Sequence, residues 1–305
     1  MRFAAVLNRD GGTLKTTDLI AYGDHIREAF SRHGHEVDIV ATPGNSLVAN
    51  LREAFQAERL DAVIVGGGDG SVSAAASLAI EYDRTLGIIP AGTMNLYARS
   101  LKIPLELNEA AESLAAGRPG FSDIGTANGE VFLHQFSVGL HPRVIRQRNR
   151  FSFASRMGKI GASMLAAIDA IRQPVSFPVQ IKFDGRFLEG VATSVAISNN
   201  PYGEGHLPYA DRVDRGRLGL YFVKGPLSSG NQARLLADLT LGTWRNNPDL
   251  QEFSCESVVL HFPKLRRDAL AVMDGELLPL PRDVTLRVHS GALKVWLPEP
   301  KPAET

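Results

Sequence analysis

A glycine-rich turn lies between an apolar run and a run of small residues. Ala62-Val63-Ile64-Val65 is expected to form a buried strand, and Val72-Ser73-Ala74-Ala75-Ala76 is expected to begin a closely packed helix. The turn between them, Gly66-Gly67-Gly68-Asp69-Gly70-Ser71, lets backbone N–H groups approach an anion, and a helix N-terminus favours negative charge. The segment therefore predicts a phosphate-binding loop in an α/β fold.

Asp69 is the informative residue of this turn. A carboxylate among phosphate-binding amides is suited to hold Mg²⁺ on a nucleotide phosphate or to act as a base. The alternative is structural: the glycines serve packing, and Asp69 caps the helix that follows.

A second turn of the same kind follows the next apolar run. Residues 86–89 read as a short strand that leads into Pro90-Ala91-Gly92-Thr93-Met94-Asn95. Thr93 and Asn95 can donate and accept hydrogen bonds there, although Thr93 could simply cap the next helix. Two such turns at the carboxyl ends of successive strands predict the ligand crevice of an open α/β sheet.

The periodicity changes near Gly120. Before it, strand-like and helix-like segments alternate with short links, which is typical of a doubly wound, mostly parallel sheet. After it, residues 122–127 and 130–138 are joined by Asn128-Gly129, and residues 180–183 and 186–197 by Asp184-Gly185, which are hairpin signals. We expect a nucleotide-binding domain over 1–121 and a β-rich antiparallel domain over 122–290, with helices inserted near 153–171 and 231–241.

The combined motifs resemble the catalytic domain of diacylglycerol kinases and sphingosine kinases, particularly the bacterial soluble lipid kinases. GGDGS and PAGTMNLYAR carry the resemblance, together with the loop from Asn8 to Gly12, Thr42, and the late motif Asp274-Gly275-Glu276. GGDG alone is shared with phosphofructokinases and NAD kinases, whereas its combination with GTMN and DGE is more specific. The resemblance implies a fold like that of NAD kinases and diacylglycerol kinases, in which the final segment, 291–305, returns to the first domain.

The resemblance also implies cofactors and site residues. ATP and Mg²⁺ are the expected cofactors, with Asp69 at the metal and Asp274 or Glu276 as the base, Asp274 being preferred. The expected nucleotide-binding residues are Asn8, Gly11, Gly12, Thr42, Gly67, Gly68, Asp69, Gly70, Ser71, Thr93 and Asn95. Taken by itself, Asp274-Gly275 reads as another hairpin turn.

Two positions depart from the family pattern. Leu96 stands where the family usually has an aspartate after the asparagine of the second motif. In the second domain, Arg215 and Gly219 replace both aspartates of a stretch that supports a structural Mg²⁺ in bacterial members. An arginine cannot serve as the oxygen ligand that Mg²⁺ needs. Arg215 could take the place of the cation electrostatically.

Composition bounds the location and the partners. The formal net charge is zero, so the chain has no overall positive charge that would favour binding to nucleic acid. The single cysteine, Cys255, indicates a reducing compartment, and no stretch approaches the ~20 apolar residues of a membrane span. We expect a cytoplasmic protein that meets its lipid at the inner membrane face. The basic segment 143–159 either docks on anionic lipid or is a solvated helix face. A homodimer is left open.

The sequence thus predicts an ATP- and Mg²⁺-dependent kinase that phosphorylates a hydroxyl of a diacylglycerol-like lipid in the interdomain cleft. Two alternatives stay open. One is a soluble-substrate kinase of the NAD kinase or phosphofructokinase type. The other, motivated by Leu96 and Arg215, is a nucleotide- or lipid-binding protein with little kinase activity.

Overall fold

The computed structural model describes residues 1–148 and 176–299. The chain divides into two compact units. The first contains Met1–Ser122, Arg212–Asp214 and Gly291–Thr305, and the second contains Asp123–Asp211 and Arg215–Ser290. The helix predicted near 153–171 and most of the basic segment 143–159 lie outside the described residues.

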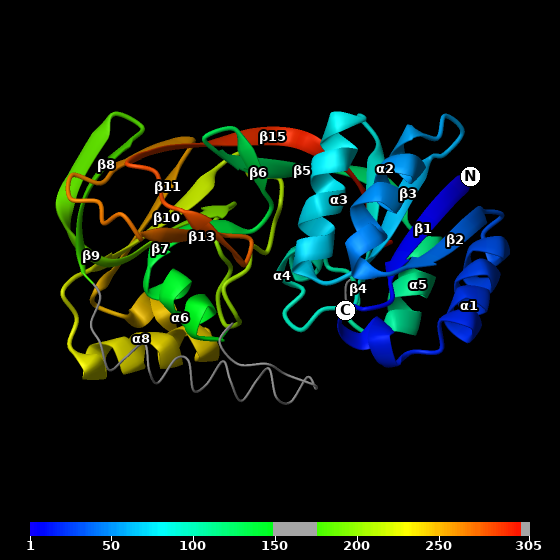
Figure 1. The fold of residues 1–305 in the computed structure, drawn as a ribbon, viewed down its shortest axis with the longest axis horizontal. Helices are drawn as coiled ribbons and strands as arrows, with labels where there is room; N and C mark the ends of the chain where they lie inside the picture. Colours follow the sequence, from blue (N-terminus) through cyan, green and yellow to red (C-terminus); the bar gives the residue numbers. More distant parts are fainter. Residues whose placement is uncertain (149–175, 300–305) are drawn as a thin grey trace, which may run out of the picture. The chain divides into compact units, whose positions relative to one another are not determined.

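The first unit is built on a parallel sheet with the order β4-β3-β1-β2 (Figure 1). Its strands are β1 (Arg2–Asn8), β2 (Glu36–Thr42), β3 (Ala62–Gly67) and β4 (Thr85–Pro90). The end of β15 (Asp283–Leu297) extends this sheet, because Val295 pairs in parallel with Leu86 of β4. The central strands β3 and β4 are apolar and almost wholly buried, as parallel strands covered on both faces require, whereas the edge strand β2 leaves Glu36, Asp38, Val40 and Ala41 exposed.

Helices cover both faces of this sheet. α1 (Leu19–Arg32) and α5 (Leu107–Ala115) pack on the face to which Phe3, Ala5 and Leu7 of β1 point. α2 (Leu47–Gln56) and α3 (Asp69–Glu81) cover the opposite face (Figure 1). A doubly wound layer structure results, as the alternation of elements predicts.

The core of the first unit is aromatic at one edge. The rings of Phe30 and Trp296 both meet the ring of Phe3 edge to face, with centroids 5.0 Å apart in each case. The indole N–H of Trp296 donates to the carbonyl of Leu114 at 2.8 Å. The buried indole therefore has its polar group satisfied.

The second unit is antiparallel and β-rich. Its strand order is β14-β13-β7-β9-β8-β12-β15, and β10 pairs with both β9 and β11. The strands are β7 (Gln135–Gly139), β8 (Phe177–Phe183), β9 (Arg186–Asn199), β10 (Leu218–Lys224), β11 (Leu250–Cys255), β12 (Ser257–His261), β13 (Leu270–Met273) and β14 (Glu276–Pro279). β5 (Arg118–Ala127) and β6 (Glu130–Phe132) form a further hairpin.

Short helices complete the two units. They are η1 (Gly12–Thr16), η2 (Gly44–Ser46), α4 (Leu96–Ser100), α6 (Leu140–Arg148), α8 (Ser229–Leu241) and η3 (Trp244–Asn246). α6 packs against β7 and β13 within the second unit.

Three hairpins of the second unit turn on an Asn-Gly or Asp-Gly pair. Both residues of Asn128-Gly129, Asp184-Gly185 and Asp274-Gly275 have positive φ, with values of 50° and 92°, 42° and 76°, and 47° and 89°. This is the turn that matches the twist of antiparallel strands, and these residue types tolerate it best. The first two hairpins agree with the sequence prediction, and the third shows that Asp274-Gly275 is indeed a hairpin turn.

One predicted strand is interrupted. The sequence predicts a continuous strand over 130–138, but the structure has β6 and β7 with a break at Leu133 and His134. The backbone N–H groups of these two residues donate to the carboxylate of Asp274 instead of to a neighbouring strand. A long-range side-chain acceptor thus replaces the sheet hydrogen bonds at this point.

Candidate functional site

Four loops of the first unit lie at the same edge of its sheet. They follow β1, β2, β3 and β4, all parallel, so their starting points are the carboxyl ends of neighbouring strands. The order of the strands reverses between β1 and β3, which makes this the point where open α/β sheets bind ligands. The predicted nucleotide-binding residues lie at these strand ends, in the loops that follow them, or in the first turn of the next helix, as Asp69, Gly70 and Ser71 of α3 do.

Asn8 joins the loop after β1 to the loop after β3. Its side-chain amide donates to the hydroxyl of Ser71 at 3.2 Å and accepts from the backbone N–H of Asp10 at 3.1 Å. The N–H of Gly11 donates to the Asn8 carbonyl at 3.1 Å. The side chain therefore fixes the relative positions of both loops.

Two glycines let the loops approach backbone to backbone. Gly12 has a φ of +47°, and a Cβ on it would overlap the carbonyl oxygen of Ala91. A Cβ on Gly68 would lie 3.2 Å from the Cα of Gly92, in the loop after β4. Neither position tolerates a side chain without moving a neighbouring loop.

Thr42 occupies the end of β2 and is buried. Its hydroxyl accepts a hydrogen bond from the Asn50 side chain at 3.0 Å. In the adjoining loop, the carboxylate of Asp10 accepts from the N–H of Gly44 at 2.8 Å. In this structure, Thr42 thus supports the loop from inside.

Asp69 connects the two glycine-containing motifs. One of its carboxylate oxygens accepts from the N–H of Asn95 at 3.0 Å, and the other accepts from the N–H of Leu96 at 2.8 Å. These donors lie at the start of α4, whereas the residue that caps Asp69's own helix is Gly68. The simple N-cap interpretation is therefore wrong for α3, because the carboxylate satisfies the N-terminus of another helix.

The second motif is folded around the side chain of Asn95. This residue has a left-handed φ of 50°, and its amide accepts from the N–H of Gly92 at 2.8 Å and donates to the Gly92 carbonyl at 3.0 Å. Thr93 is half-buried and does not cap α4, whose N-cap is Asn95. Within residues 1–148 and 176–299, the Thr93 hydroxyl has no hydrogen-bond partner.

This arrangement fits the phosphate chain of a nucleotide. α3 begins at the glycine-rich turn, where the first N–H groups of a helix lack acceptors inside that helix. Asp69 is the carboxylate nearest these groups along the chain. Mg²⁺ in kinases is held by one or two carboxylates together with substrate phosphates and water, so a single aspartate is compatible with it. No group of three metal-ligating side chains occurs among the described residues.

Asp274 is bound to β7 in the second unit. Its carboxylate accepts from the N–H groups of Leu133 at 2.7 Å, His134 at 2.9 Å and Gln135 at 3.0 Å, and its own N–H donates to the Gln135 carbonyl at 3.0 Å. Successive backbone N–H groups of this kind form a nest for an anion. Glu276, two residues further on, is exposed, and its side chain has no hydrogen bond or ion pair within the described part of the chain.

Side chains that the sequence did not single out surround this carboxylate. The Gln135 amide contacts the Nδ1 atom of His141 at 3.1 Å and accepts from the Tyr202 hydroxyl at 2.5 Å. The Tyr202 ring stacks on Tyr221 with centroids 4.7 Å apart. Burial raises the pKa of Tyr202 well above its ordinary value, and the charges of Tyr221 and Asp274 add to this effect. Tyr202 is therefore a neutral hydrogen-bond donor.

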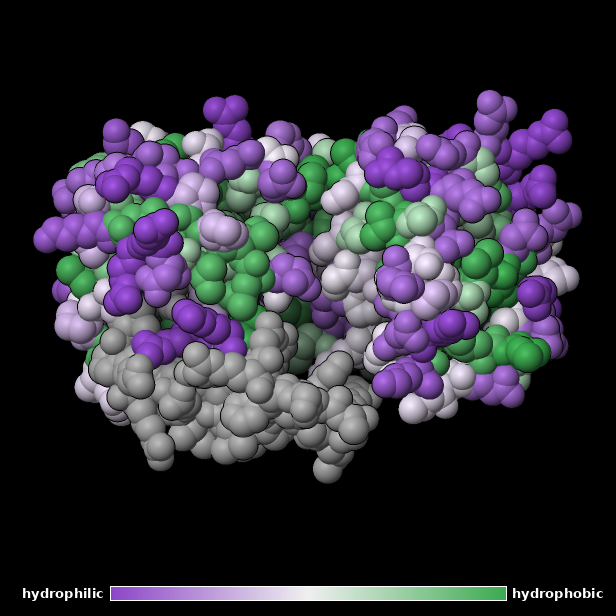
Figure 2. Space-filling view, viewed as in Figure 1, coloured by the Kyte–Doolittle hydropathy of each residue, from purple (hydrophilic) through white to green (hydrophobic). Residues whose placement is uncertain are grey.

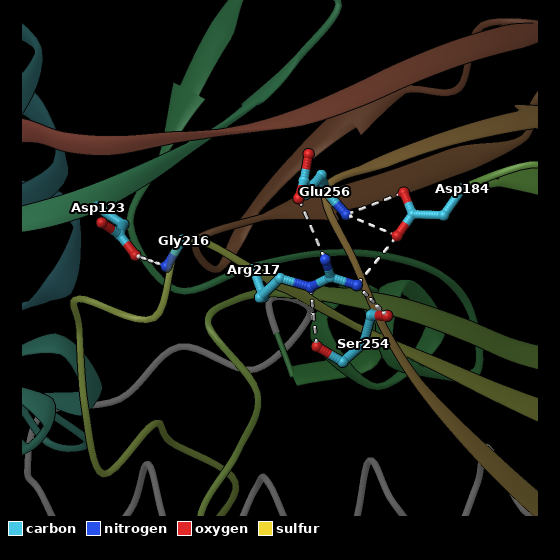
Figure 3. Close-up of polar contacts among 6 residues, drawn as sticks. All are labelled: Asp123, Asp184, Gly216, Arg217, Ser254 and Glu256. Atoms are coloured by element: carbon cyan, nitrogen blue, oxygen red, sulfur yellow. Dashed lines mark hydrogen bonds and ion pairs between the residues drawn. The ribbon is translucent and has the colours of Figure 1, made fainter.

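A buried carboxylate of the second unit, Asp123, also escaped the sequence prediction. It accepts from the N–H of Gly216 at 2.6 Å (Figure 3). The preceding residue, Arg215, donates its N–H to the side chain of Asn200 at 2.9 Å, while its own side chain is exposed and forms no ion pair with any described residue. Arg215 thus does not take the place of a cation, and the segment does not fit the family's second-domain Mg²⁺.

Arg217 binds this segment to two neighbouring strands. Its guanidinium donates to Asp184 at 3.0 Å, to Glu256 at 3.2 Å and to the Ser254 carbonyl at 2.9 Å (Figure 3). The Asp184 carboxylate also accepts from the N–H of Glu256 at 3.1 Å. The β8–β9 turn and the β11–β12 turn are thereby tied to the start of β10.

Comparison with known proteins agrees with this architecture. The family model of the diacylglycerol kinase catalytic domain matches residues 2–127, and that of the YegS C-terminal NAD kinase beta sandwich-like domain matches residues 135–297. A crystal structure of a diacylglycerol kinase from Bacillus anthracis str. Sterne shares the fold, with a TM-score of 0.72 and 21% identity over 100% of this chain and 98% of that chain.

Two curated relatives match shorter segments. Diacylglycerol kinase of Bacillus subtilis (strain 168) is 25% identical over 204 residues, which cover 65% of this chain and 67% of the relative. A relative from Streptococcus pneumoniae serotype 4 is 32% identical over 142 residues, which cover 46% of this chain and 47% of the relative. The chain thus matches about two thirds of one relative and about half of the other.

The fold is that of a doubly wound α/β unit joined to an antiparallel β-rich unit, which confirms the predicted fold class. The chain belongs to the diacylglycerol kinase family of lipid kinases, and along it the catalytic-domain match precedes the YegS-type C-terminal match. No helix within the described ranges combines the length and the apolar character needed to cross a bilayer.

Proposed function

We propose that this protein transfers the terminal phosphoryl group of ATP, with Mg²⁺, to a hydroxyl of a diacylglycerol-like lipid. The observation that carries the proposal is the pair of hydrogen bonds from Asn95 and Leu96 to Asp69. These hydrogen bonds join the GGDGS motif to the PAGTMNLYAR motif at the carboxyl ends of the parallel strands. Family membership supports the reaction class.

In this proposal the first unit holds the nucleotide. Phosphoryl transfer depends mainly on positioning and on stabilising charge. The backbone of the glycine-rich turn would bind the phosphates, the hydroxyls of Ser71 and Thr93 would contribute donors, and Asp69 would meet the cation. Mg²⁺, when bound, would neutralise charge on the phosphate oxygens.

The second unit contributes the acceptor side in this proposal. Asp274 and Glu276 are the two carboxylates of the late motif, and either can take the proton of the acceptor hydroxyl. Three N–H donors orient Asp274, but they also occupy most of its acceptor capacity. Glu276 is unencumbered. The pair therefore divides into a firmly positioned carboxylate and a free one.

A lipid kinase of this kind would work in the cytoplasm at the inner face of the membrane. The second candidate is a nucleotide- or lipid-binding protein with little turnover. A specific observation favours it: at position 96 this chain presents to Asp69 only a backbone N–H, where the family usually adds a carboxylate.

Radiolabelled ATP incubated with the protein and a total lipid extract tests the proposal. Label in a lipid product that requires Mg²⁺, and that disappears with Asp69→Ala, would support the kinase. ATP binding by calorimetry without labelled lipid would favour the binder. Label in a water-soluble product would favour the kinases of NAD or sugar phosphates.

A further inference from the structure

A basic surface lies on the second unit, centred on a link that the sequence analysis did not single out and joined by Arg146 of the basic segment 143–159. The link between β12 and β13 contains Lys264, Arg266 and Arg267 within four residues, and all three are exposed. Hydrophilic side chains gather over this part of the second unit in Figure 2, where Figure 1 draws the link that leads into β13. The link contains a single acid, Asp268, which Arg266 contacts at 3.2 Å.

Cations from two other elements join this link. Arg282 is exposed and donates to the carbonyl of Pro263 at 3.1 Å, at the base of the link. Arg146 of α6 is also exposed. The pKa of Asp268 is lowered, chiefly by its hydrogen bond from Arg266, and the charge of Arg146 contributes, so Arg146 is within electrostatic range of the link.

Most of these charges lack a counter-charge. No ion pair is formed by Arg146, Lys264, Arg267 or Arg282 with any residue that the structure describes. Elsewhere, the exposed arginines Arg27, Arg32, Arg52, Arg212, Arg234 and Arg245 form ion pairs, whereas Arg186, Arg215 and Arg287 form none with described residues. The basic surface is distinguished by three exposed cations within four residues of one link. The chain has 33 basic and 33 acidic residues, so this local excess arises from arrangement and not from composition.

We propose that this basic surface, defined as Arg146, Lys264, Arg266, Arg267 and Arg282, docks the second unit on an anionic lipid membrane. Cations without counter-charges on an exposed link are attracted by the negative potential of anionic lipids. Leu265, the apolar residue among them, is half-buried against the core, so the contact is electrostatic and does not depend on insertion into the bilayer.

The basic surface lies close in sequence to the hairpin that carries Asp274. The inference that follows rests on the proposed lipid-kinase function. The link leads directly into β13, and Asp274 follows the last residue of β13, Met273. Four residues of strand span about 13 Å. Docking would therefore hold the acceptor-side hairpin about one strand length from the surface from which the lipid must come.

The test is vesicle co-sedimentation of the full chain, with vesicles of phosphatidylcholine alone or mixed with phosphatidylglycerol. Each basic residue at an anionic surface strengthens binding about fivefold, so Lys264→Gln/Arg267→Gln should weaken binding to the anionic vesicles about 25-fold. Raising the salt concentration should weaken wild-type binding as well, because exposed charges are screened.

A matched control removes two charges at the opposite end of β12. Arg186 and Arg287 are exposed and form no ion pair within the described residues; they lie beside Phe183 and Ser257, whereas the basic surface follows His261. Arg186→Gln/Arg287→Gln should change binding less than about twofold. Equal losses in the two double variants, or binding that is the same on neutral and anionic vesicles, would overturn the proposal.

Turnover separates this inference from the proposed function. If the protein is a lipid kinase, Lys264→Gln/Arg267→Gln should lose turnover on vesicle-borne diacylglycerol but keep it on a dispersed short-chain diacylglycerol. If no lipid is phosphorylated, the proposed function fails, while the sedimentation experiment still decides whether the surface binds membranes.

Discussion

At the scale of single residues, Asp69 has two roles in the proposal. It would meet the nucleotide's cation, and it satisfies two N–H groups at the start of α4. Asp69→Ala should abolish turnover and should also lower the free energy of unfolding by about 1 kcal/mol, the usual cost of losing a capping acceptor. Lipid phosphorylation and urea denaturation measure the two effects.

Asp69→Asn is the control for this prediction. Asparagine keeps the size and one acceptor oxygen but loses the charge, so stability should recover in part while turnover should not. Near-normal turnover by purified Asp69→Ala would contradict the proposed role at the cation.

The late motif gives a second residue-level prediction, in which two conservative variants are compared. Loss of a general base slows a reaction about 10²–10⁴-fold. We expect Asp274→Asn to show this loss with ATP affinity nearly unchanged. It should also destabilise the second unit, since one acceptor oxygen of the Asp274 carboxylate becomes an amide that cannot accept.

Glu276→Gln removes only an exposed charge and should leave stability unchanged. If Glu276→Gln loses turnover while Asp274→Asn retains it, Glu276 is the base and Asp274 is a positioning residue. If both variants retain full turnover, the motif is only a hairpin turn. Turnover, ATP calorimetry and thermal unfolding together decide the assignment.

The sequence predicted which residues lie in these turns better than it predicted their hydrogen-bond partners. The glycines, Asp69 and Asn95 were predicted to lie where strands end and the next helices begin, and the structure places them at the carboxyl ends of β3 and β4. Their role in binding phosphate stays a prediction. The donors to Asp69 are 26 and 27 residues away in sequence, and those to Asp274 are 139 to 141 residues away, so no local pattern indicates them. The signal for Asp123 was available: an acid inside an apolar strand.

At the scale of elements, the turns were easier to predict than the strands between them. Asn-Gly and Asp-Gly pairs indicate the hairpins directly because few other residues adopt two successive positive φ values. β11 was missed because its residues Gln251, Glu252 and Ser254 dilute the apolar pattern. Its position beside β10 is fixed by long-range pairing, which single-strand propensity does not capture.

Arg217 offers a prediction about how two turns of the second unit are held together. Its contacts to Asp184, Ser254 and Glu256 surround the turn that carries the single thiol, Cys255. Burial raises the pKa of Cys255 to about 12, so the folded protein should react slowly with thiol reagents near neutral pH. Arg217→Leu should speed labelling about fivefold, as expected for an opening equilibrium shifted by about 1 kcal/mol.

Thiol labelling under native conditions, followed by absorbance, measures this rate. Arg215→Leu is the matched control, since the Arg215 side chain is exposed and forms no ion pair with described residues. It should label at the wild-type rate. An unchanged rate for Arg217→Leu would mean that the two turns are held by the backbone hydrogen bonds alone.

At the scale of the whole molecule, the two units are expected to respond differently to metal and nucleotide. The proposed nucleotide loops belong to the first unit, whereas the second unit has no group of three metal-ligating side chains among its described residues. Its departures at Arg215 and Gly219 remove carboxylates that would favour a bound cation. Removing the metal or the nucleotide therefore tests whether both are bound by the first unit.

Calorimetric unfolding with and without ligands provides this last test. Mg²⁺ and ATP at about a hundred times the dissociation constant should stabilise the first unit by about 2.7 kcal/mol. EDTA alone should shift neither unit, whereas EDTA added with ATP should remove part of the nucleotide effect, because in the proposal Asp69 would help to hold the Mg²⁺ that accompanies ATP. Asp69→Ala should show a smaller nucleotide effect that EDTA does not change. Labelling of Cys255 during heating reports the second unit separately. If EDTA alone lowers the temperature at which Cys255 becomes reactive, the second unit holds a structural cation after all, and the substitution at Arg215 has not removed it.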